Sequence, residues 1–242
     1  MHEQDPPPSG ITTAPSTTIT ITTDPPAAPT PKPRALYFAY GSNLSFTQMR
    51  MRCTHNPDLS SRPVAIARLD HWRWLICQYG YANVIPPRGL RVDRQIDSGD
   101  EVPISGPEDT VYGVLYEMDD ADEILLDGYE GVDTERPASG QTEKVPVRVR
   151  PREQGSGSYN KWYVDAGVTR WLVGEEERRR WVGDGDASTT RVLVYVDEVG
   201  VVVGKPNEEY VPRMNRAMRE AETIGFPKEW ADEVMRKFIP PN

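Results

Sequence analysis

The sequence predicts a mixed α+β domain that follows a tail without a core of its own. Apolar runs typical of buried strands recur between residues 35 and 118 and again over 190–197. One helical pattern, at 119–131, lies among these runs, and helical patterns follow the last of them. Strands first, one helix among them and helices at the end are typical of the α+β class.

The composition limits the classes of function that the chain can have. Of its 242 residues 37% are hydrophobic, and it has 23 Pro and 19 Gly, so we expect one part to stay outside the core that the rest can form. The formal net charge of −9 disfavours nucleic-acid binding, because phosphate recognition relies on a basic surface.

The two cysteines and three histidines argue against a disulfide framework or a metal site, because neither type shows the necessary number or spacing. No apolar run is long enough to span a membrane. Residues 1–34 also lack an apolar signal segment, so the cytoplasm is the expected location.

Residues 1–34 are expected to be a disordered tail. They are rich in Pro and Thr, lack aromatic residues, and cannot bury enough surface to offset the entropy of ordering. The tail is either a plain extension or a tether that binds a partner, and its composition favours the extension.

The domain is expected to span residues 35–242 and to begin with strands. ALYFAY at 35–40 is typical of a buried strand, and a short helix should follow because Ser45 and Gln48 have capping-box spacing. Further strands are expected at 64–69, 72–79, 80–86, 110–118, 143–150 and 190–197. Residues 88–108 and 151–190 are expected to be irregular inserted loops, which either cover a pocket or, as we favour, are passive surface.

The helix expected at 119–131 has clear ends, since Asp119 or Asp120 can cap its start and Gly131 can end it. We expect apolar residues of this helix to anchor it to the core: Ile124, Leu125 and Tyr129.

Two helices are expected at the C-terminus. The first has an apolar face made of Tyr210, Met214, Ala217, Met218 and Ala221. Gly225 can stop it, Pro227 can start the second helix, and residues 228–238 then place apolar side chains at helical spacing.

YFAYGSNL, at residues 37–44, is the most informative stretch. A strand delivers the chain to Gly41, Ser42 and Asn43 just before a helix. Gly and Asn tolerate positive φ, so successive backbone N–H groups can converge on an anion, and the helix N-terminus adds positive charge. The alternative is an ordinary turn between a strand and a helix.

Glu130 is the candidate acid–base. It ends the helix in LLDGYEGV, where the helix dipole disfavours a carboxylate, and partial burial would further raise its proton affinity. The alternative is a solvated glutamate at a helix end.

Several other side chains are expected to be structural. Trp72 and Trp74 should face one side of a strand, as core or as pocket wall, and Tyr195 should fill the core rather than line a pocket. Cys53 and Cys77 are expected to be buried and inert.

Five motifs in order resemble the γ-glutamylcyclotransferase family, of the wider AIG2-like fold: YFAYGSNL, AIARL, GYANV, VYGVLYEM and LDGYEGV. The C-terminal helices resemble those of fungal members. The resemblance implies a small, mixed, strongly bent β-barrel flanked by helices, with a pocket beside the YGSN loop.

It also implies an activity, the cyclisation of a γ-glutamyl group to 5-oxoproline with release of an amine. Backbone N–H groups of Gly41, Ser42, Asn43 and Leu44 would hold the substrate α-carboxylate, with Tyr40 opening the loop. Glu130 would move the proton. The resemblance implies no metal or organic cofactor and a small γ-glutamyl molecule as partner, with neither nucleic acid nor membrane. A homodimer is one possible assembly.

One departure leaves the substrate open. Family members commonly carry a Tyr a few residues after EGV, but the segment from Glu130 to Val147 contains no aromatic residue. The substrate is therefore a γ-glutamyl amino acid, or else a γ-glutamylamine or a γ-glutamylated secondary metabolite. The family's glutathione-specific branch is disfavoured because its fingerprint reads YGSL. A non-catalytic binding module is the remaining alternative.

Overall fold

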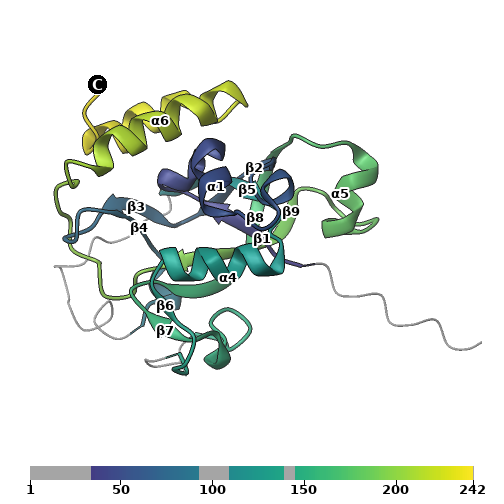
Figure 1. Ribbon diagram of the computed structural model, residues 1–242, viewed down its shortest axis with the longest axis horizontal. Helices are drawn as coiled ribbons and strands as arrows, with labels where there is room; N and C mark the ends of the chain where they lie inside the picture. Colours follow the sequence, from purple (N-terminus) through teal and green to yellow (C-terminus); the bar gives the residue numbers. More distant parts are fainter. Residues whose placement is uncertain (1–33, 93–108, 139–144, 242) are drawn as a thin grey trace, which may run out of the picture. The chain divides into compact units, whose positions relative to one another are not determined.

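The computed structural model describes residues 34–92, 109–138 and 145–241. Its centre is a closed barrel with the strand order β1-β5-β2-β8-β9, in which β1 pairs with β9 to close the circle (Figure 1). The β1–β9 pair is parallel and the other pairs in the barrel are antiparallel. The barrel strands are β1 (Leu36–Ala39), β2 (Pro63–Asp70), β5 (Thr110–Tyr116), β8 (Asn160–Trp171) and β9 (Thr189–Val196). The expected tail lies outside the described residues except for Arg34, as does most of the expected loop at 88–108.

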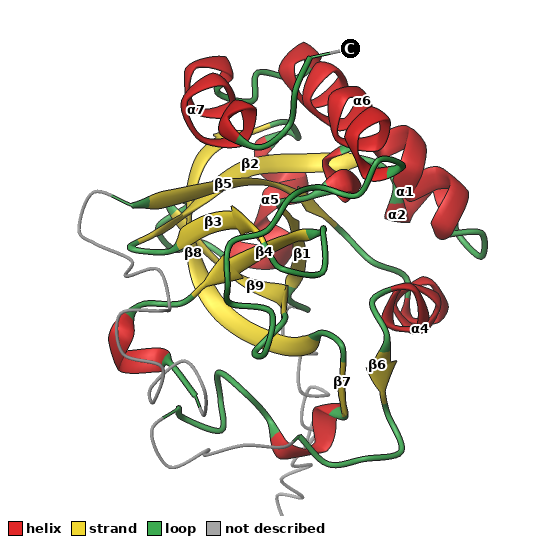
Figure 2. Ribbon diagram, turned by 90° about the vertical axis from the view of Figure 1, so that its left-hand side faces the viewer, coloured by secondary structure: helices red, strands yellow, loops and turns green. Residues whose placement is uncertain are grey.

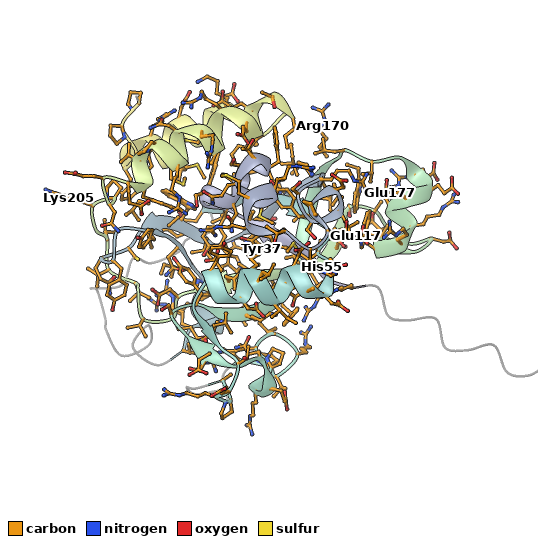
Figure 3. The ribbon with its side chains drawn as sticks, viewed as in Figure 1. Tyr37, His55, Glu117, Arg170, Glu177 and Lys205 are labelled. Atoms are coloured by element: carbon orange, nitrogen blue, oxygen red, sulfur yellow. The ribbon has the colours of Figure 1, made fainter. Side chains whose placement is uncertain are left out.

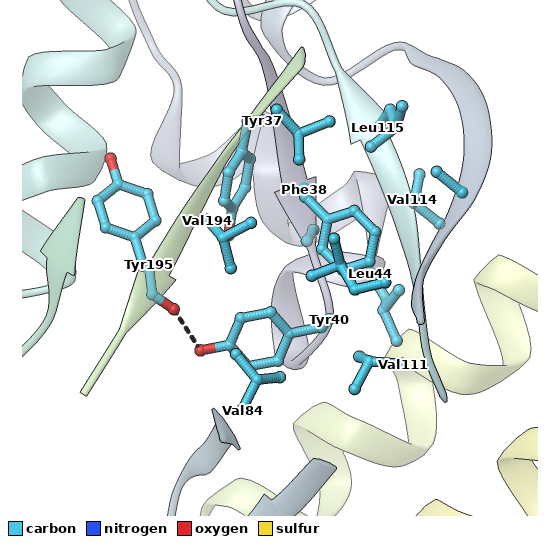
Figure 4. Packing of buried hydrophobic residues seen from close by; sticks show 14 of the residues in the cluster. Tyr37, Phe38, Tyr40, Leu44, Val84, Val111, Val114, Leu115, Val194 and Tyr195 are labelled. Carbon is cyan, nitrogen blue, oxygen red and sulfur yellow. Dashed lines mark hydrogen bonds between the residues drawn. The ribbon is translucent and has the colours of Figure 1, made fainter. Parts of the chain in front are cut away.

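Apolar side chains from β1, β5 and β9 fill the barrel (Figure 4). All of β1 is buried, and Phe38 packs with Val114 of β5 and Val194 of β9 in one hydrophobic cluster. Gly113 makes this packing possible, because a Cβ there would lie 2.5 Å from the Phe38 ring. These contacts confirm the strands expected at 35–40, 110–118 and 190–197.

Helices flank the barrel, with α6 and α7 together on one side and α4 beside β6 (Figure 2). The helices are α1 (Phe46–Arg52), α2 (Pro57–Ser60), α4 (Asp120–Tyr129), α5 (Glu175–Val182), α6 (Tyr210–Thr223) and α7 (Lys228–Val234). Short 3₁₀ turns are η1 (Ser42–Leu44), η2 (Arg88–Leu90), η4 (Arg152–Gln154) and η5 (Met235–Lys237). The apolar face expected for the first C-terminal helix is buried along α6.

Two small antiparallel pairs lie outside the barrel: β3 (Arg73–Ile76) with β4 (Ala82–Ile85), and β6 (Val132–Asp133) with β7 (Ser156–Gly157). The first pair is a hairpin, and the second brings the chain after α4 alongside the chain before β8. The candidate site lies between them.

The strand expected at 143–150 is wrong where the structure describes it. Residues 147–149 form a turn. The carbonyl of Pro146 accepts hydrogen bonds from the backbone N–H groups of Val149 and Arg150, at 2.8 and 3.1 Å. Proline fixes its own φ and favours such a turn over continued strand pairing.

The segment 151–190 is not irregular, as expected, but contains β8 and α5. β8 escaped detection because Asn160, Lys161 and Gly167 interrupt its apolar alternation, although residues 160–167 pair with β9. The charged helix α5, which carries Glu177, lies across the barrel from hairpin β3–β4 (Figure 3).

The anchors expected for α4 are also wrong. Ile124 and Tyr129 are 70% and 58% exposed, and Leu125 is exposed as well. The helix instead directs the carboxylates of Asp122 and Asp127 toward the interior. Buried Asp122 accepts hydrogen bonds from the backbone N–H groups of His55 and Asn56, at 2.8 and 2.9 Å. The buried face of α4 therefore consists of Asp122, Leu126 and Asp127, so one apolar side chain and two carboxylates anchor the helix in place of the three expected residues.

No helix among the described residues is long and apolar enough to cross a bilayer.

Candidate active site

Glu130 lies at the C-terminal end of α4, where Gly131 turns the chain away with φ +67°. Its carboxylate oxygen Oε1 accepts a hydrogen bond from Asn43 Nδ2 at 3.1 Å and one from Arg52 Nη1 at 3.0 Å. The Glu130 side chain is 16% exposed. The structure thus joins the two motifs that the sequence singled out, although 87 residues separate them.

The environment raises the pKa of Glu130 above its ordinary value. Burial is the largest cause, because it disfavours the charged form. The positive charge of Arg52 and the hydrogen bond from Asn43 act in the opposite direction but do not cancel the effect of burial. A carboxyl group with a raised pKa suits a residue that must both accept and return a proton.

The Gly41–Leu44 turn differs from the expected anion nest. Gly41 has φ −115°, so no left-handed residue opens the turn, and residues 42–44 form η1. The Leu44 N–H donates to the Gly41 carbonyl at 2.9 Å, and the Ser42 N–H donates to the Tyr210 hydroxyl at 3.2 Å. Glycine is required here for space, because a Cβ on Gly41 would lie 2.8 Å from that hydroxyl.

Side chains rather than backbone groups make the turn polar. The Ser42 hydroxyl accepts hydrogen bonds from Gln48 Nε2 at 2.7 Å and from Arg213 Nη2 at 3.0 Å. Gln48 therefore faces the turn and does not complete the expected capping box, although Ser45 caps α1 by accepting from the Gln48 N–H. Arg213 brings a guanidinium group from α6 to this turn.

These groups border an open cavity of about 730 Å³. Its lining includes Glu130, the guanidinium-bearing residues Arg52 and Arg213, and eight of the chain's eleven tyrosines. The tyrosines are Tyr37, Tyr40, Tyr79, Tyr81, Tyr129, Tyr159, Tyr195 and Tyr210. Tyr40, Gly41, Ser42 and Asn43 line the cavity as expected, whereas Leu44 is buried in the hydrophobic core instead.

Two of the tyrosine hydroxyls have a proton to donate into this space. The Tyr210 oxygen accepts from the backbone of Ser42 and of Ala82, and the Tyr37 oxygen accepts from Asn43 Nδ2 at 2.9 Å. Within the described part of the chain neither hydroxyl has an acceptor of its own. Burial raises the pKa of Tyr210 to about 12, so the proton stays on the oxygen near neutral pH.

An aromatic residue, Tyr159, lies beside Glu130 although the sequence directly after EGV contains none. Its N–H donates to the Glu130 carbonyl at 3.3 Å and its hydroxyl to the Ala82 carbonyl at 2.8 Å. It reaches the cavity because β6 and β7 pair just before it. Part of the 151–190 segment therefore builds the cavity wall, contrary to the passive role that we favoured.

The structure confirms some of the positions that the sequence predicted for other side chains. Trp72 and Trp74 belong to the core and do not line the cavity. Tyr195 does both, since it is buried in the core and also lines the cavity. Its carbonyl accepts a hydrogen bond from the Tyr40 hydroxyl at 2.6 Å (Figure 4). Cys53 and Cys77 are buried free thiols, which confirms their expected burial.

Sequence reasoning missed five polar residues around Glu130 and the turn: Tyr37, Arg52, Tyr159, Tyr210 and Arg213. Tyr210 was assigned only to the apolar face of α6, where its ring does lie. A charged residue one turn further on, Arg213, was the available signal that this face also meets a polar site. In the described residues no three His, Cys, Asp or Glu side chains gather as a metal site would require.

No protein-family model matches the chain, and no curated protein does. Several solved structures are similar to it. A structure described as gamma-glutamyl cyclotransferase is 19% identical with a TM-score of 0.47, over 86% of this chain and 89% of that chain. YkqA from Bacillus subtilis is 15% identical with a TM-score of 0.48, over 86% and 56%. A yeast gamma-glutamyl cyclotransferase specific to glutathione is 12% identical with a TM-score of 0.39, over 81% and 90%. At these values none of them assigns an activity to this chain.

Proposed function

We propose that the cavity binds a γ-glutamyl compound and cyclises its glutamyl part to 5-oxoproline, with Glu130 as the acid–base. One observation carries the proposal. The Glu130 carboxylate has a raised pKa and lies on an open cavity beside a polar turn and two guanidinium groups. The motif resemblance of the sequence names the same reaction.

The γ-glutamyl head has one negative and one positive group, and the cavity offers complementary partners for both. The α-carboxylate would lie at the Gly41–Asn43 turn, where Arg213 supplies positive charge and the Ser42 hydroxyl a further polar contact. Charge-assisted hydrogen bonds of this kind are roughly twice as strong as neutral ones. The α-ammonium would then lie toward Glu130.

Two protons leave the α-nitrogen during the reaction. Glu130 takes the first from the α-ammonium, and the free amine attacks the γ-carbonyl carbon to form the ring C–N bond. Glu130 returns that proton to the departing nitrogen as the original amide C–N bond breaks, and the second proton, lost by the new ring nitrogen, passes through Glu130 to the released amine, which leaves as an ammonium ion. The products are 5-oxoproline and an amine, with no other reactant consumed.

Negative charge develops on the γ-carbonyl oxygen during the attack. The hydroxyl protons of Tyr37 and Tyr210 point to no acceptor among the described residues, so they are available to that oxygen. Donors held in place before the reaction stabilise such charge without reorganisation. Both hydroxyls are fixed by protein N–H groups, which supports this role.

Five-membered ring closure is intramolecular, so the protein gains most by folding the substrate and moving the proton. Cys77 also lines the cavity and could act as a nucleophile in place of the substrate amine. Burial, however, raises the pKa of its thiol and disfavours the reactive thiolate. A covalent thiol route is therefore less well supported than direct cyclisation.

A mass-spectrometric screen tests the proposal. The full chain is incubated with γ-glutamyl dipeptides, γ-glutamyl-lysine and glutathione, and 5-oxoproline is measured. We expect 5-oxoproline and free amine in equal amounts from at least one compound. Release of glutamate instead would show hydrolysis rather than cyclisation, and no product from any γ-glutamyl compound would contradict the proposal.

A further inference from the structure

One end of the cavity has no role in the cyclisation steps. It is formed by the turn of hairpin β3–β4 and by the chain after β9. Three residues there both line the cavity and face solvent: Tyr79 is 54% exposed, Tyr81 38% and Val199 45%. A residue with both properties lies at the mouth. We call Tyr79, Tyr81 and Val199 the tyrosine rim.

The tyrosine rim is held in place before any ligand binds. The Tyr81 ring packs edge-on against the Tyr210 ring, with centroids 5.2 Å apart. Between the two rim tyrosines Gly80 has φ +85°, and Asn207 packs against it and donates to the Tyr79 carbonyl at 3.0 Å. Fixed aromatic rings bind a partner at low cost in conformational entropy.

The cations that line the cavity are already engaged by other groups of the site, and Arg213 also lies over the Tyr210 ring, 5.2 Å from its centroid. The guanidinium groups that line the cavity, Arg52 and Arg213, donate to the residues of the polar turn and to Glu130. At the rim end the charged lining residue is Asp197, whose Oδ1 accepts from the N–H groups of Val199 and Gly200 at 2.9 and 2.7 Å. Lys205 follows this end in sequence but is exposed and points outward (Figure 3).

A carboxylate on the departing amine would therefore meet the Asp197 carboxyl group in the wall, and the two lining cations, Arg52 and Arg213, already donate to the polar turn and to Glu130. An aromatic or aliphatic group would instead lie on exposed rings and a valine. A second negative charge near Asp197 disfavours binding of the departing amine, and burial of apolar surface favours it. Both effects favour an apolar amine without a carboxylate.

We propose that the tyrosine rim receives the departing amine, and that the preferred substrate is the γ-glutamyl amide of an aromatic amine without a carboxylate. This inference rests on the proposed function, since it concerns the other half of the same substrate. The γ-amide C–N bond breaks, the ring C–N bond forms, and the amine leaves with the proton that Glu130 returns.

Four substrates that differ in two groups only test the inference. They are γ-glutamyl-phenethylamide, γ-glutamyl-phenylalanine, γ-glutamyl-ethylamide and γ-glutamyl-alanine. Within each size pair the second compound adds one carboxylate, and within each charge pair the phenyl ring is added or removed. We expect kcat/KM for 5-oxoproline release to be about tenfold higher for the phenethyl than for the ethyl amide, as burial of one ring allows. Each amide should also exceed its carboxylated counterpart.

Two variants place these preferences on named residues. Tyr79→Ser should reduce the ratio of phenethylamide to ethylamide efficiency, while Val202→Ser, a nearby exposed residue outside the lining, should leave that ratio unchanged. Asp197→Asn should narrow the ratio of each amide to its carboxylated counterpart. Because each ratio is taken within one variant, a general loss of folded protein cancels.

The outcomes separate this inference from the proposed function. If none of the four compounds yields 5-oxoproline, the proposed function itself fails. If 5-oxoproline forms but a carboxylated compound equals or exceeds its amide, or the ethyl amide equals the phenethyl amide, the inference is overturned and the proposed function stands.

Discussion

The side-chain amide of Asn43 joins the polar turn to the candidate acid–base by donating a hydrogen bond to Glu130 at 3.1 Å. Its carbonyl oxygen accepts in turn from Gln48 at 2.7 Å and from Arg52 at 3.1 Å. Asn43 is 4% exposed, so these bonds are formed away from bulk water. The position of the carboxylate therefore depends on a network that spans η1, α1 and the C-terminal end of α4.

Arg52 should determine the pH at which kcat/KM falls on the acid side of its pH profile. Its positive charge lowers the pKa of Glu130 and partly opposes the effect of burial. In Arg52→Met that opposition is lost, so the Glu130 pKa rises further and the base form requires a higher pH. We expect the acid limb of the kcat/KM profile to move to higher pH.

The matched control for that measurement is Arg50→Met, on the same helix but exposed and paired with Asp58. It should leave the acid limb in place. An acid limb that stays unchanged, or moves to lower pH, in Arg52→Met would disconnect Arg52 from the protonation of Glu130.

Glu130→Gln should increase the free energy of unfolding at neutral pH, because it removes a buried group that loses its proton there. Because the folded-state pKa of Glu130 is raised, its proton favours folding below the unfolded pKa of about 4.3, and that contribution is lost as the pH rises through the folded pKa. Gln stays neutral at every pH. The variant should therefore gain stability relative to wild type as the pH rises from 4 to 8.

Urea unfolding across this pH range measures the difference. Glu229→Gln, an exposed change on α7, controls for the removal of one negative charge. A gap that shrinks or reverses toward pH 8 would mean that the Glu130 carboxylate is stabilised rather than destabilised by its surroundings.

Gly41→Val should reduce turnover far more than Ser42→Ala. A Cβ at residue 41 would meet the Tyr210 hydroxyl at 2.8 Å and the Ala82 side chain at 3.3 Å, so the turn must move. A displacement of about 1 Å in an active site can cost 10²-fold, and we expect a loss of that order in kcat/KM. Ser42→Ala leaves the backbone in place and removes one polar contact.

A substrate whose α-carboxylate is amidated should turn over poorly. The amide loses the charge-assisted contact with the Arg213 guanidinium. Steady-state rates with matched acid and amide substrates check this. Equal efficiencies would remove the Gly41–Asn43 turn and Arg213 from substrate binding, even if cyclisation itself were observed.

The buried pair of Arg150 and Glu198 should carry stability rather than activity. Arg150 is fully buried, its guanidinium contacts Glu198 through two nitrogens, and Trp162 Nε1 donates to the same carboxylate at 2.8 Å. Breaking one partner of such a pair leaves a charge uncompensated and costs about 3–5 kcal/mol. Arg150→Met should lose about this much in chemical unfolding, whereas the exposed Arg148→Met should lose less than about 0.5 kcal/mol.

The sequence was most informative where one local pattern determines one element. The apolar runs of β1, β5 and β9 and the helical face of α6 needed no knowledge of distant residues, and the structure confirms them. Glu130 was singled out partly for the same reason, since helix end, glycine and carboxylate are adjacent in the chain, but its role as acid–base also rests on the motif resemblance and stays a prediction.

The missed features are those that depend on partners far along the chain. β8 begins with the polar residues Asn160 and Lys161, which are buried where β8 pairs with β9, and Lys161 forms ion pairs with Glu123 and Asp127 of α4. The inward face of α4 is set by Asp122 and Asp127, whose partners lie elsewhere in sequence. Arg213 reaches Ser42 across 171 residues, a contact that no local pattern predicts.

The central claim is that Glu130 moves the proton in a cyclisation, and one comparison tests it most directly. Wild-type protein and Glu130→Gln are each mixed with a γ-glutamyl substrate identified by the screen, and 5-oxoproline is followed over time, with substrate binding and folding checked separately. We expect the variant to fold and bind but to lose about 10²–10⁴-fold in kcat, the usual contribution of general acid–base catalysis. A folded variant that turns over within about twofold of wild type would exclude Glu130 from the proton transfer and contradict the account.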